Sequence, residues 1–351
     1  MRLFSASTFF CAIFVMSVGA ESNSAAVSDT QQKLCAAFAK RFEAAERHGA
    51  HAIVGTDGWL FLPAEVRFLS VGRFWSEDAP KVSRAQKLEQ ADPLPAILNF
   101  RDQLKQRGIE LLLVPVPPKA AIYPEKILPA FNASSDDAAP YLHRFYDELR
   151  AHGVEILDLT PAFLEKREGE HGAAFCRTDT HWSGAGCVMV ADAIANKVRD
   201  KLGLSGAPDR YAAEWRQVEI KGDLVSLLPP DSPKPAPERI QVRAVIDKST
   251  GKLVQPDPNS PLLLLGDSHT LVYHEFHAEG AGLVDQMAEN FGFAPDLLGT
   301  RGSGAMAVRT DLYRRAHRDP TYLAKKKMIV WCFAAREFTE ADGWPQLPVS
   351  P

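Results

Sequence analysis

Amphipathic helices alternate with uninterrupted apolar strands along most of this chain, and no other feature constrains the fold as strongly. A helical pattern in residues 94–108 (LPAILNFRDQLKQRG) precedes the apolar run 109–117 (IELLLVPVP), and the same unit recurs as far as residues 328–334 (MIVWCFA). Strands that are apolar throughout are buried on both faces, as in a parallel sheet between two layers of helices. The sequence therefore predicts an α/β fold with a three-layer, doubly wound and mostly parallel sheet.

Two segments fall outside this alternation. Residues 31–49 have the apolar spacing of a helix, and the turn-forming pair Asp57-Gly58 predicts a hairpin soon after them. Residues 203–260 are rich in Pro, Asp and Lys and contain only short strand candidates, such as RIQVRAVID. We expect a tail and helix over residues 21–50, one domain over 51–340 with an inserted irregular β element at 203–260, and a C-terminal tail over 341–351.

The first twenty residues have the pattern of a targeting segment. They carry one Arg, an apolar centre and the small-residue end Val18-Gly19-Ala20, which a signal peptidase recognises. We expect residues 1–20 to be a cleaved secretory signal. An uncleaved anchor is the alternative, although the apolar stretch from Ser7 to Val18 is shorter than the roughly 20 residues that span a bilayer.

Charge and cysteine content narrow the functional classes. The formal net charge of −4 disfavours nucleic-acid binding, which calls for a basic surface. In an oxidising compartment, one or two disulfides are expected among Cys35, Cys176, Cys187 and Cys332, with buried unpaired thiols as the alternative. Because these cysteines form no C-x-x-C pair, we expect no zinc site, and we expect no cofactor.

The run LLLLGDSH at residues 262–269 places a serine directly after a buried strand. Ligands of open parallel sheets bind outside the carboxyl ends of the strands, where Ser268 is expected to lie. A serine in that position is equally suited to cap a helix, and Asp267 to be an acid of its first turn. The run alone therefore leaves catalysis and capping open. His269 is adjacent in sequence and is expected to point away from Ser268.

A second stretch, TDTHW, supplies the groups that a serine nucleophile needs. Asp179 and His181 are two residues apart, so in extended backbone their side chains point the same way and the carboxylate can fix the tautomer of the imidazole. A loop carboxylate that caps backbone amides, beside a histidine packed on Trp182, is the structural alternative. With Ser268 the pair would complete a nucleophile–base–acid triad.

The motifs GTDGWLFL, LLVPVPPKAAIYPEKI, TDTHWSGAG, LLLLGDSHT and GSGAMA occur in this order. This combination resembles the periplasmic alginate O-acetyltransferase family of the AlgJ and AlgX type, whose catalytic domain is related to SGNH hydrolases. The similarity spans residues 51–340. Ordinary SGNH hydrolases have the serine early and the Asp/His pair late, whereas this chain has the reverse order, as the acetyltransferase family does.

The resemblance implies an O-acetyltransferase that carries an acetyl group on Ser268 and passes it to a hydroxyl of a secreted polysaccharide, alginate-like or cellulose-like. In this mechanism His181 would act as base and acid, and Asp179 would orient it. The backbone N–H of Ser268 is the first candidate donor to the oxyanion. Gly302 and Gly304 are a second candidate, although Gly-Ser-Gly is also common in ordinary strand-to-helix loops.

Four further residues are candidates for holding a sugar. Lys119 and Tyr123 follow the strand at 109–117, and Arg336 follows the last strand, so all three are expected at the same sheet edge. Each of them also suits a surface ion pair or a packing role. Trp182 is expected to be a pocket wall or a core residue rather than a direct ligand.

The chain ends at Pro351, which leaves no room for the carbohydrate-binding module of the AlgX type, so the AlgJ type fits better. The resemblance then implies a periplasmic, inner-membrane-associated protein that receives acetyl groups from a membrane-bound O-acyltransferase and works with other exopolysaccharide secretion proteins. Two alternatives remain from the residues alone. One is a polysaccharide acetylesterase with the same triad, and the other is a non-catalytic polysaccharide-binding or scaffold protein.

Overall fold

A computed structural model describes residues 28–131, 137–205, 209–302 and 304–350 of the chain. The expected signal segment, residues 1–20, lies outside these ranges. Within them, no helix is both long and apolar enough to cross a membrane.

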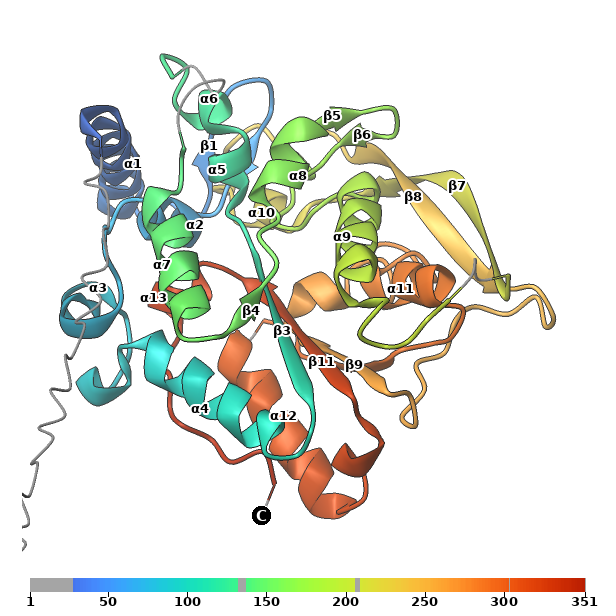
Figure 1. The fold of residues 1–351 in the computed structure, drawn as a ribbon. Helices are drawn as coiled ribbons and strands as arrows, with labels where there is room; N and C mark the ends of the chain where they lie inside the picture. Colours follow the sequence, from blue (N-terminus) through green and yellow to red (C-terminus); the bar gives the residue numbers. More distant parts are fainter. Residues whose placement is uncertain (1–27, 132–136, 206–208, 303, 351) are drawn as a thin grey trace, which may run out of the picture.

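A five-stranded parallel sheet forms the centre of the molecule, as the sequence predicts (Figure 1). Its strands, in spatial order, are β10 (Asp296–Gly299), β9 (Leu262–Gly266), β11 (Met328–Ala334), β3 (Glu110–Val116) and β4 (Glu155–Ile156). Every neighbouring pair is parallel. All five residues of β9 and all seven of β11 are buried, which explains their continuous apolar sequences.

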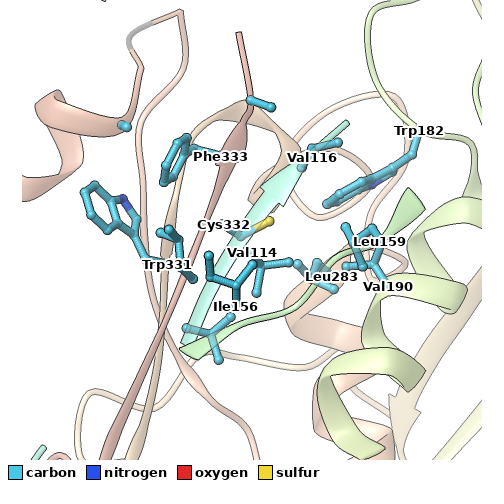
Figure 2. Close-up of a cluster of buried hydrophobic side chains, with 14 of the residues drawn as sticks. Val114, Val116, Ile156, Leu159, Trp182, Val190, Leu283, Trp331, Cys332 and Phe333 are labelled. Carbon is cyan, nitrogen blue, oxygen red and sulfur yellow. The ribbon is translucent and has the colours of Figure 1, made fainter. Parts of the chain in front are cut away.

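Helices cover both faces of this sheet (Figure 1). One face carries α4 (Pro93–Lys105), α7 (Pro140–Ala151) and α12 (Ala305–Arg318), and the other carries α9 (Gly184–Val198) and α11 (Leu283–Phe291). Side chains alternate accordingly along β11. Trp331 packs edge-on against Phe100 of α4, whereas Cys332 points to the opposite side, toward Val190 and Leu283 (Figure 2). The predicted three-layer α/β architecture is confirmed.

The N-terminal helix and hairpin are also confirmed. Helix α1 (Asp29–Arg47) begins with a capping box in which the Ser28 side chain accepts the backbone N–H of Gln31. Strands β1 (Ile53–Val54) and β2 (Leu60–Phe61) pair antiparallel across a turn in which Asp57 and Gly58 have φ values of 55° and 77°. Two successive positive φ values are typical of a type I′ turn, which favours Asp-Gly.

Short elements complete the chain. The helices are α2 (Pro63–Phe68), α3 (Ala79–Val82), α5 (Lys119–Ile122), α6 (Pro124–Ile127), α8 (Thr160–Glu165), α10 (Asp223–Ser226) and α13 (Glu337–Glu340). Single 3-10 turns lie at Ser76–Asp78, Leu88–Gln90, Ser268–Thr270 and Leu323–Lys325. Strands β5 (Glu168–Gly169) and β6 (Gly172–Ala173) form a small hairpin.

The inserted β element is present at residues 203–260 and the strand candidate RIQVRAVID forms most of β8, but the expectation that its strands are short and irregular is wrong. Strands β7 (Tyr211–Ile220) and β8 (Glu238–Asp247) are ten residues each and pair along their whole length as an antiparallel ribbon. Most of β7 is half-buried or exposed, so it lacks the apolar run that marks the strands of the central sheet. The ribbon lies beside α9 and α11 (Figure 1).

The C-terminal segment is packed onto the domain. Trp344 is buried, and its backbone N–H donates to the carbonyl of Gln90. Val349 is buried as well, and its N–H donates to the side chain of Gln103 in α4. The residues expected to form a tail therefore contribute to the core.

The structure shows whether the four cysteines form disulfides or remain thiols. Cys35, Cys176, Cys187 and Cys332 are all buried and all free. The alternative of unpaired thiols is therefore correct for these four positions.

Candidate active site

Ser268 lies at the carboxyl end of a central strand, the edge at which open parallel sheets usually bind their ligands. Strand β9 ends at Gly266, which is in register with Cys332 of β11. A Cβ atom on Gly266 would lie 2.0 Å from the Cys332 carbonyl oxygen, so only glycine allows the two strands to approach this closely. Asp267 then caps a single 3-10 turn that begins with Ser268. The serine side chain is thus half-exposed on a rigid support.

His181 and Asp179 reach Ser268 from a different loop. The Nε2 atom of His181 lies 2.8 Å from Ser268 Oγ, and its Nδ1 atom lies 2.6 Å from Asp179 Oδ1. Because a carboxylate only accepts hydrogen bonds, Nδ1 carries the proton and Nε2 is free to accept from the serine hydroxyl. Ser183 ends this loop as the N-cap of α9. The structure therefore brings the three residues of the predicted triad together.

The carboxylate of Asp179 is buried and fully hydrogen-bonded. Oδ1 also accepts the backbone N–H of His181 at 3.0 Å, while Oδ2 accepts the backbone N–H of Asp223 at 2.8 Å and lies 3.0 Å from His277 Nε2. Burial raises the pKa of Asp179, but the hydrogen bonds from His181 and His277 outweigh it and hold that pKa well below its usual value. Asp179 is therefore a carboxylate at neutral pH.

The same contacts make His181 more basic. Burial lowers the pKa of His181, but its hydrogen bond to Asp179 and the nearby negative charges have the larger effect and raise it above the ordinary value. An imidazole in this state readily takes a proton from a hydroxyl group, because the resulting cation is stabilised by the carboxylate behind it.

The β7–β8 ribbon holds the loop that carries Asp179 and His181. Just past β7, Asp223 accepts the backbone N–H and the hydroxyl of Thr180 at 2.8 and 2.5 Å. At the start of β8, Glu238 accepts the backbone N–H groups of Arg177 and Thr178. The segment expected to be a mere insertion is thus part of the site.

Sequence reasoning missed Asp223 and His277. Asp223 contacts Asp179 through its backbone, which leaves no signature in residue type. His277 offered a weak signal, since it is a polar residue nine positions after Ser268 in the segment LVYHEFH.

Asp267 and His269 form a pair of their own beside the predicted triad, which sequence reasoning did not anticipate. His269 Nδ1 lies 3.1 Å from Asp267 Oδ1, and Asp267 Oδ2 accepts the backbone N–H of Ala334 at 2.7 Å. The ring of His269 packs edge-on against Trp182. Asp267 therefore ties the end of β9 to the end of β11 and has a structural role.

Lys119 does not face a ligand, contrary to the sequence prediction. Its side chain is fully buried, and Nζ donates to the carbonyl oxygens of Cys176 at 3.0 Å, Arg177 at 3.2 Å and Asp179 at 2.7 Å. Burial lowers the pKa of Lys119. The residue anchors the backbone of the loop that carries Asp179, because three carbonyls of that loop converge on one ammonium group.

Tyr123 and Trp182 are also interior residues. The Tyr123 hydroxyl donates to the carbonyl of Arg167 at 2.5 Å and accepts the N–H of Ala174 at 2.9 Å, so its polar end is already occupied. Trp182 is fully buried and lies in the core (Figure 2). The prediction of a sugar-binding role is wrong for Tyr123, and the core alternative is correct for Trp182.

Arg336 remains at the sheet edge, half-buried. Its guanidinium donates to Glu65 at 3.0 Å. On the other side of the site, the ring of Phe276 lies 5.6 Å from the His181 ring, and the guanidinium of Arg301 lies 4.0 Å above Phe276. Arg301 is exposed, so a cation lies on the Phe276 ring that packs against His181, and sequence reasoning did not single it out.

Gly302 and Gly304 line an open cavity of 550 Å³ together with Glu337. The described residues that line this cavity do not include Ser268 or His181. A Cβ atom on Gly304 would overlap the Glu337 carboxylate, whose pKa is raised by burial to about 7. A carboxyl group so close to Gly304 is unfavourable for an oxyanion. In contrast, the backbone N–H of Ser268 has no hydrogen-bond partner among the described residues.

Asp179, His181 and Asp223 also bring oxygen and nitrogen atoms within 4.8 Å of one another, as a metal site would. However, Nδ1 of His181 and Oδ1 of Asp179 are only 2.6 Å apart. Two ligands of a tetrahedral zinc ion, each about 2.1 Å from the metal, lie about 3.4 Å apart. The geometry fits a hydrogen-bonded acid–base pair better than a metal centre.

A serine at the carboxyl end of a central parallel strand, hydrogen-bonded to a histidine and an aspartate from a second loop, is the arrangement of an SGNH hydrolase-like domain. The chain belongs to the AlgX acetyltransferase family: residues 52–297 match the model of that family, which is described as an SGNH hydrolase-like domain, acetyltransferase AlgX.

Relatives and solved structures agree with this assignment. The probable alginate O-acetylase AlgJ of Pseudomonas putida is 30% identical over 231 residues, which cover 63% of this chain and 55% of the relative. AlgJ of Pseudomonas aeruginosa is 31% identical over 54% of this chain and 45% of the relative. The chain thus spans about half the length of the curated relatives it matches. The solved O-acetyltransferase domain of Pseudomonas putida AlgJ has the same fold, with a TM-score of 0.61 at 24% identity over 83% of this chain and 92% of that domain.

Proposed function

We propose that this chain is an O-acetyltransferase that carries an acetyl group on Ser268 and passes it to a hydroxyl of a secreted polysaccharide. The observation that carries the proposal is the hydrogen-bond chain from Ser268 through His181 to Asp179. The catalytic unit would be the domain over residues 51–340.

The reaction has two half-reactions. In the first, His181 Nε2 takes the proton of Ser268 Oγ as the oxygen attacks the carbonyl carbon of an acetyl donor, and the protonated imidazole then gives that proton to the leaving oxygen. In the second, His181 takes the proton of a sugar hydroxyl, whose oxygen attacks the acetyl-serine. The sugar ester leaves, and His181 returns the proton to Ser268. Asp179 stabilises the imidazolium in both steps.

Each step passes through a tetrahedral oxyanion. The backbone N–H of Ser268 would be one donor to it, because this group is unpaired among the described residues and lies beside the attacking oxygen. Gly302 and Gly304 are the weaker candidates, since their loop faces Glu337.

The acceptor would be a polyuronate of the alginate type. The relatives named above are alginate O-acetylases by name, and the exposed guanidinium of Arg301 beside Phe276 and His181 suits a carboxylate on a sugar ring. A neutral glucan such as cellulose is the competing acceptor. The protein would act in the periplasm, associated with the inner membrane, where a membrane-bound O-acyltransferase supplies acetyl groups and other exopolysaccharide secretion proteins handle the polymer.

A transfer assay tests this function. Purified protein is given a chromogenic acetyl ester with uronate or glucan oligosaccharides, and mass spectrometry records acetylated sugar. We expect acetylated oligosaccharide with the wild type and none with Ser268→Ala. If the wild type releases only acetate with every acceptor, the protein is an esterase. If Ser268→Ala turns over the donor at the wild-type rate, Ser268 is not the nucleophile.

A further inference from the structure

The carboxylate of Asp179 is shared by two imidazoles. Oδ1 faces His181, and Oδ2 lies 3.0 Å from Nε2 of His277, a half-buried residue outside the predicted triad. Because the carboxylate is ionised, Nε2 of His277 must carry the proton and donate it. The other partner of Oδ2 is the backbone N–H of Asp223.

We propose that His277 is a positioning residue that fixes the rotation of the Asp179 carboxylate, so that Oδ1 stays aligned with His181 Nδ1. The inference rests on the proposed function of Ser268, His181 and Asp179. A carboxylate with free rotation about its terminal bond would divide its charge between several orientations. With two donors on Oδ2, only Oδ1 is available to His181.

The backbone of His277 supports this role. Its φ value is 65°, in the left-handed region that few residues other than glycine adopt, although histidine does so more often than most, and Tyr273 has a φ value of 63° in the same segment. Such conformations persist where the surroundings enforce them and are common at functional sites. Here they aim His277 at Asp179 and let the Tyr273 hydroxyl donate to the Trp182 carbonyl at 2.9 Å.

The segment from Ser268 to His277 therefore makes two contributions to the site. Its first residue is the proposed nucleophile, and its last residue orients the acid that lies behind the base. Because Tyr273 and His277 both contact the loop that carries Asp179 and His181, a single short segment keeps the distances on both sides of the imidazole consistent.

The positioning role of His277 also predicts a measurable change in the pKa of His181. The hydrogen bond from His277 helps to lower the pKa of Asp179. Without it, the carboxylate could turn away from His181 and would stabilise the protonated imidazole less, so the pKa of His181 would fall. The other titratable groups near the pair, namely Asp223, Asp267, His269 and Lys119, are unchanged by a substitution at position 277.

The experiment compares His277→Phe, which removes the donor, with His277→Gln, which keeps an N–H near the position of Nε2. Rates of acetyl-ester cleavage are measured from pH 5 to 9. We expect His277→Phe to lower kcat on the order of ten- to a hundredfold with little change in KM, and to move the acid limb to lower pH. His277→Gln should recover most of the lost kcat.

A glycine variant separates the side chain from the backbone. His277→Gly suits a φ value of 65° and should fold at least as well as the wild type, yet lose kcat, which added imidazole should partly restore. Asp57→Gly, at a φ value of 55° in the exposed turn of the β1–β2 hairpin, is the matched control and should keep full activity.

Three results would overturn the role of His277. They are wild-type kcat and an unmoved acid limb in His277→Phe, no recovery in His277→Gln, or full activity in His277→Gly. The failure of the proposed function is distinguishable, because it would appear as wild-type turnover in Ser268→Ala. An NMR titration of His181 in the inactive Ser268→Ala background gives a readout independent of activity: adding His277→Phe should lower the pKa of His181.

Discussion

The Nε2 atom of His181 lies 2.8 Å from the Oγ atom of Ser268, although 87 positions separate the two residues in the chain. Different parts of the fold produce this contact. Strand β9 ends at Gly266, which lies so close to β11 that no side chain could be accommodated, and this contact fixes the position of Ser268. The β7–β8 ribbon and Lys119 hold the loop of His181 from two sides.

Removing the ammonium group of Lys119 should destabilise the fold. Lys119→Met would leave the buried carbonyls of Cys176 and Asp179 without this donor, while the Arg177 carbonyl would keep the N–H of Leu60, and we expect the free energy of unfolding to fall by about 3 kcal/mol. Chemical denaturation measures the change.

Lys234→Met is a matched control for this substitution. Lys234 also donates to three carbonyls, those of Val225, Leu228 and Pro229, but the residue is exposed, so water can replace the lost donor. The control should change stability by less than about 0.5 kcal/mol. Equal effects of the two substitutions would contradict the anchoring role of Lys119.

The approach of β9 to β11 predicts that Gly266 tolerates no side chain. In Gly266→Ala, the new Cβ atom would meet the carbonyl oxygen of Cys332 at 2.0 Å, so the strands must separate. We expect a loss of about 3 kcal/mol or more and a misplaced Ser268. Thermal melts measure the loss of stability. Gly169→Ala, whose Cβ atom would have no contact closer than 3.7 Å, is the control in these melts. A Gly266→Ala variant that is as stable and active as this control would contradict the prediction, because β9 and β11 could then separate without cost.

Activity should fall at acidic pH as His181 becomes protonated. Only the neutral imidazole can act as a base, and the raised pKa of His181 places the acid limb above the ordinary value of about 6.5. Asp179→Asn removes the negative charge that raises this pKa, so the limb should move to lower pH, while kcat falls by about 10⁴-fold. The profile of kcat/KM against pH checks both. If the acid limb of the Asp179→Asn profile lies at the same pH as in the wild type, a group other than His181 determines the pH dependence.

Arg301 should matter for an acidic acceptor and not for the chemical step. With Arg301→Gln, we expect the KM for a uronate oligosaccharide to rise by about tenfold, since one charge-assisted contact is lost, while cleavage of a small uncharged acetyl ester is unchanged. Arg314→Gln, which alters an exposed arginine of α12, is the control. Unchanged transfer to uronate in Arg301→Gln would argue for a neutral polymer.

The sequence was sufficient to predict the central sheet, because β9, β11 and all of β3 after Glu110 are buried on both faces and carry no polar side chain. It indicated β8 but missed β7 and the regular pairing of the two strands, because the ribbon is stabilised by pairing between its own strands rather than by an apolar run. The ribbon's long-range contact with the Thr180 loop has no local signature.

The predicted triad was recoverable because its chemistry requires particular side chains at a strand end and in an Asp-x-His loop. Lys119 and Tyr123 were misjudged because their position after β3 indicates the correct sheet edge but not the direction of the side chain. Both turn inward, where carbonyl groups of the chain occupy the polar atoms that a sugar would have used. Residue type alone does not distinguish these two outcomes.

Trapping of the acetyl-enzyme tests the central claim most directly. Wild-type protein is mixed with an acetyl ester without acceptor, quenched in acid, digested and examined by mass spectrometry, beside Ser268→Ala and His181→Ala. We predict one acetyl group on the peptide that contains Ser268 in the wild type, and none at that position in either variant. Acetylation at another residue, or donor turnover in Ser268→Ala equal to that of the wild type, would contradict the account.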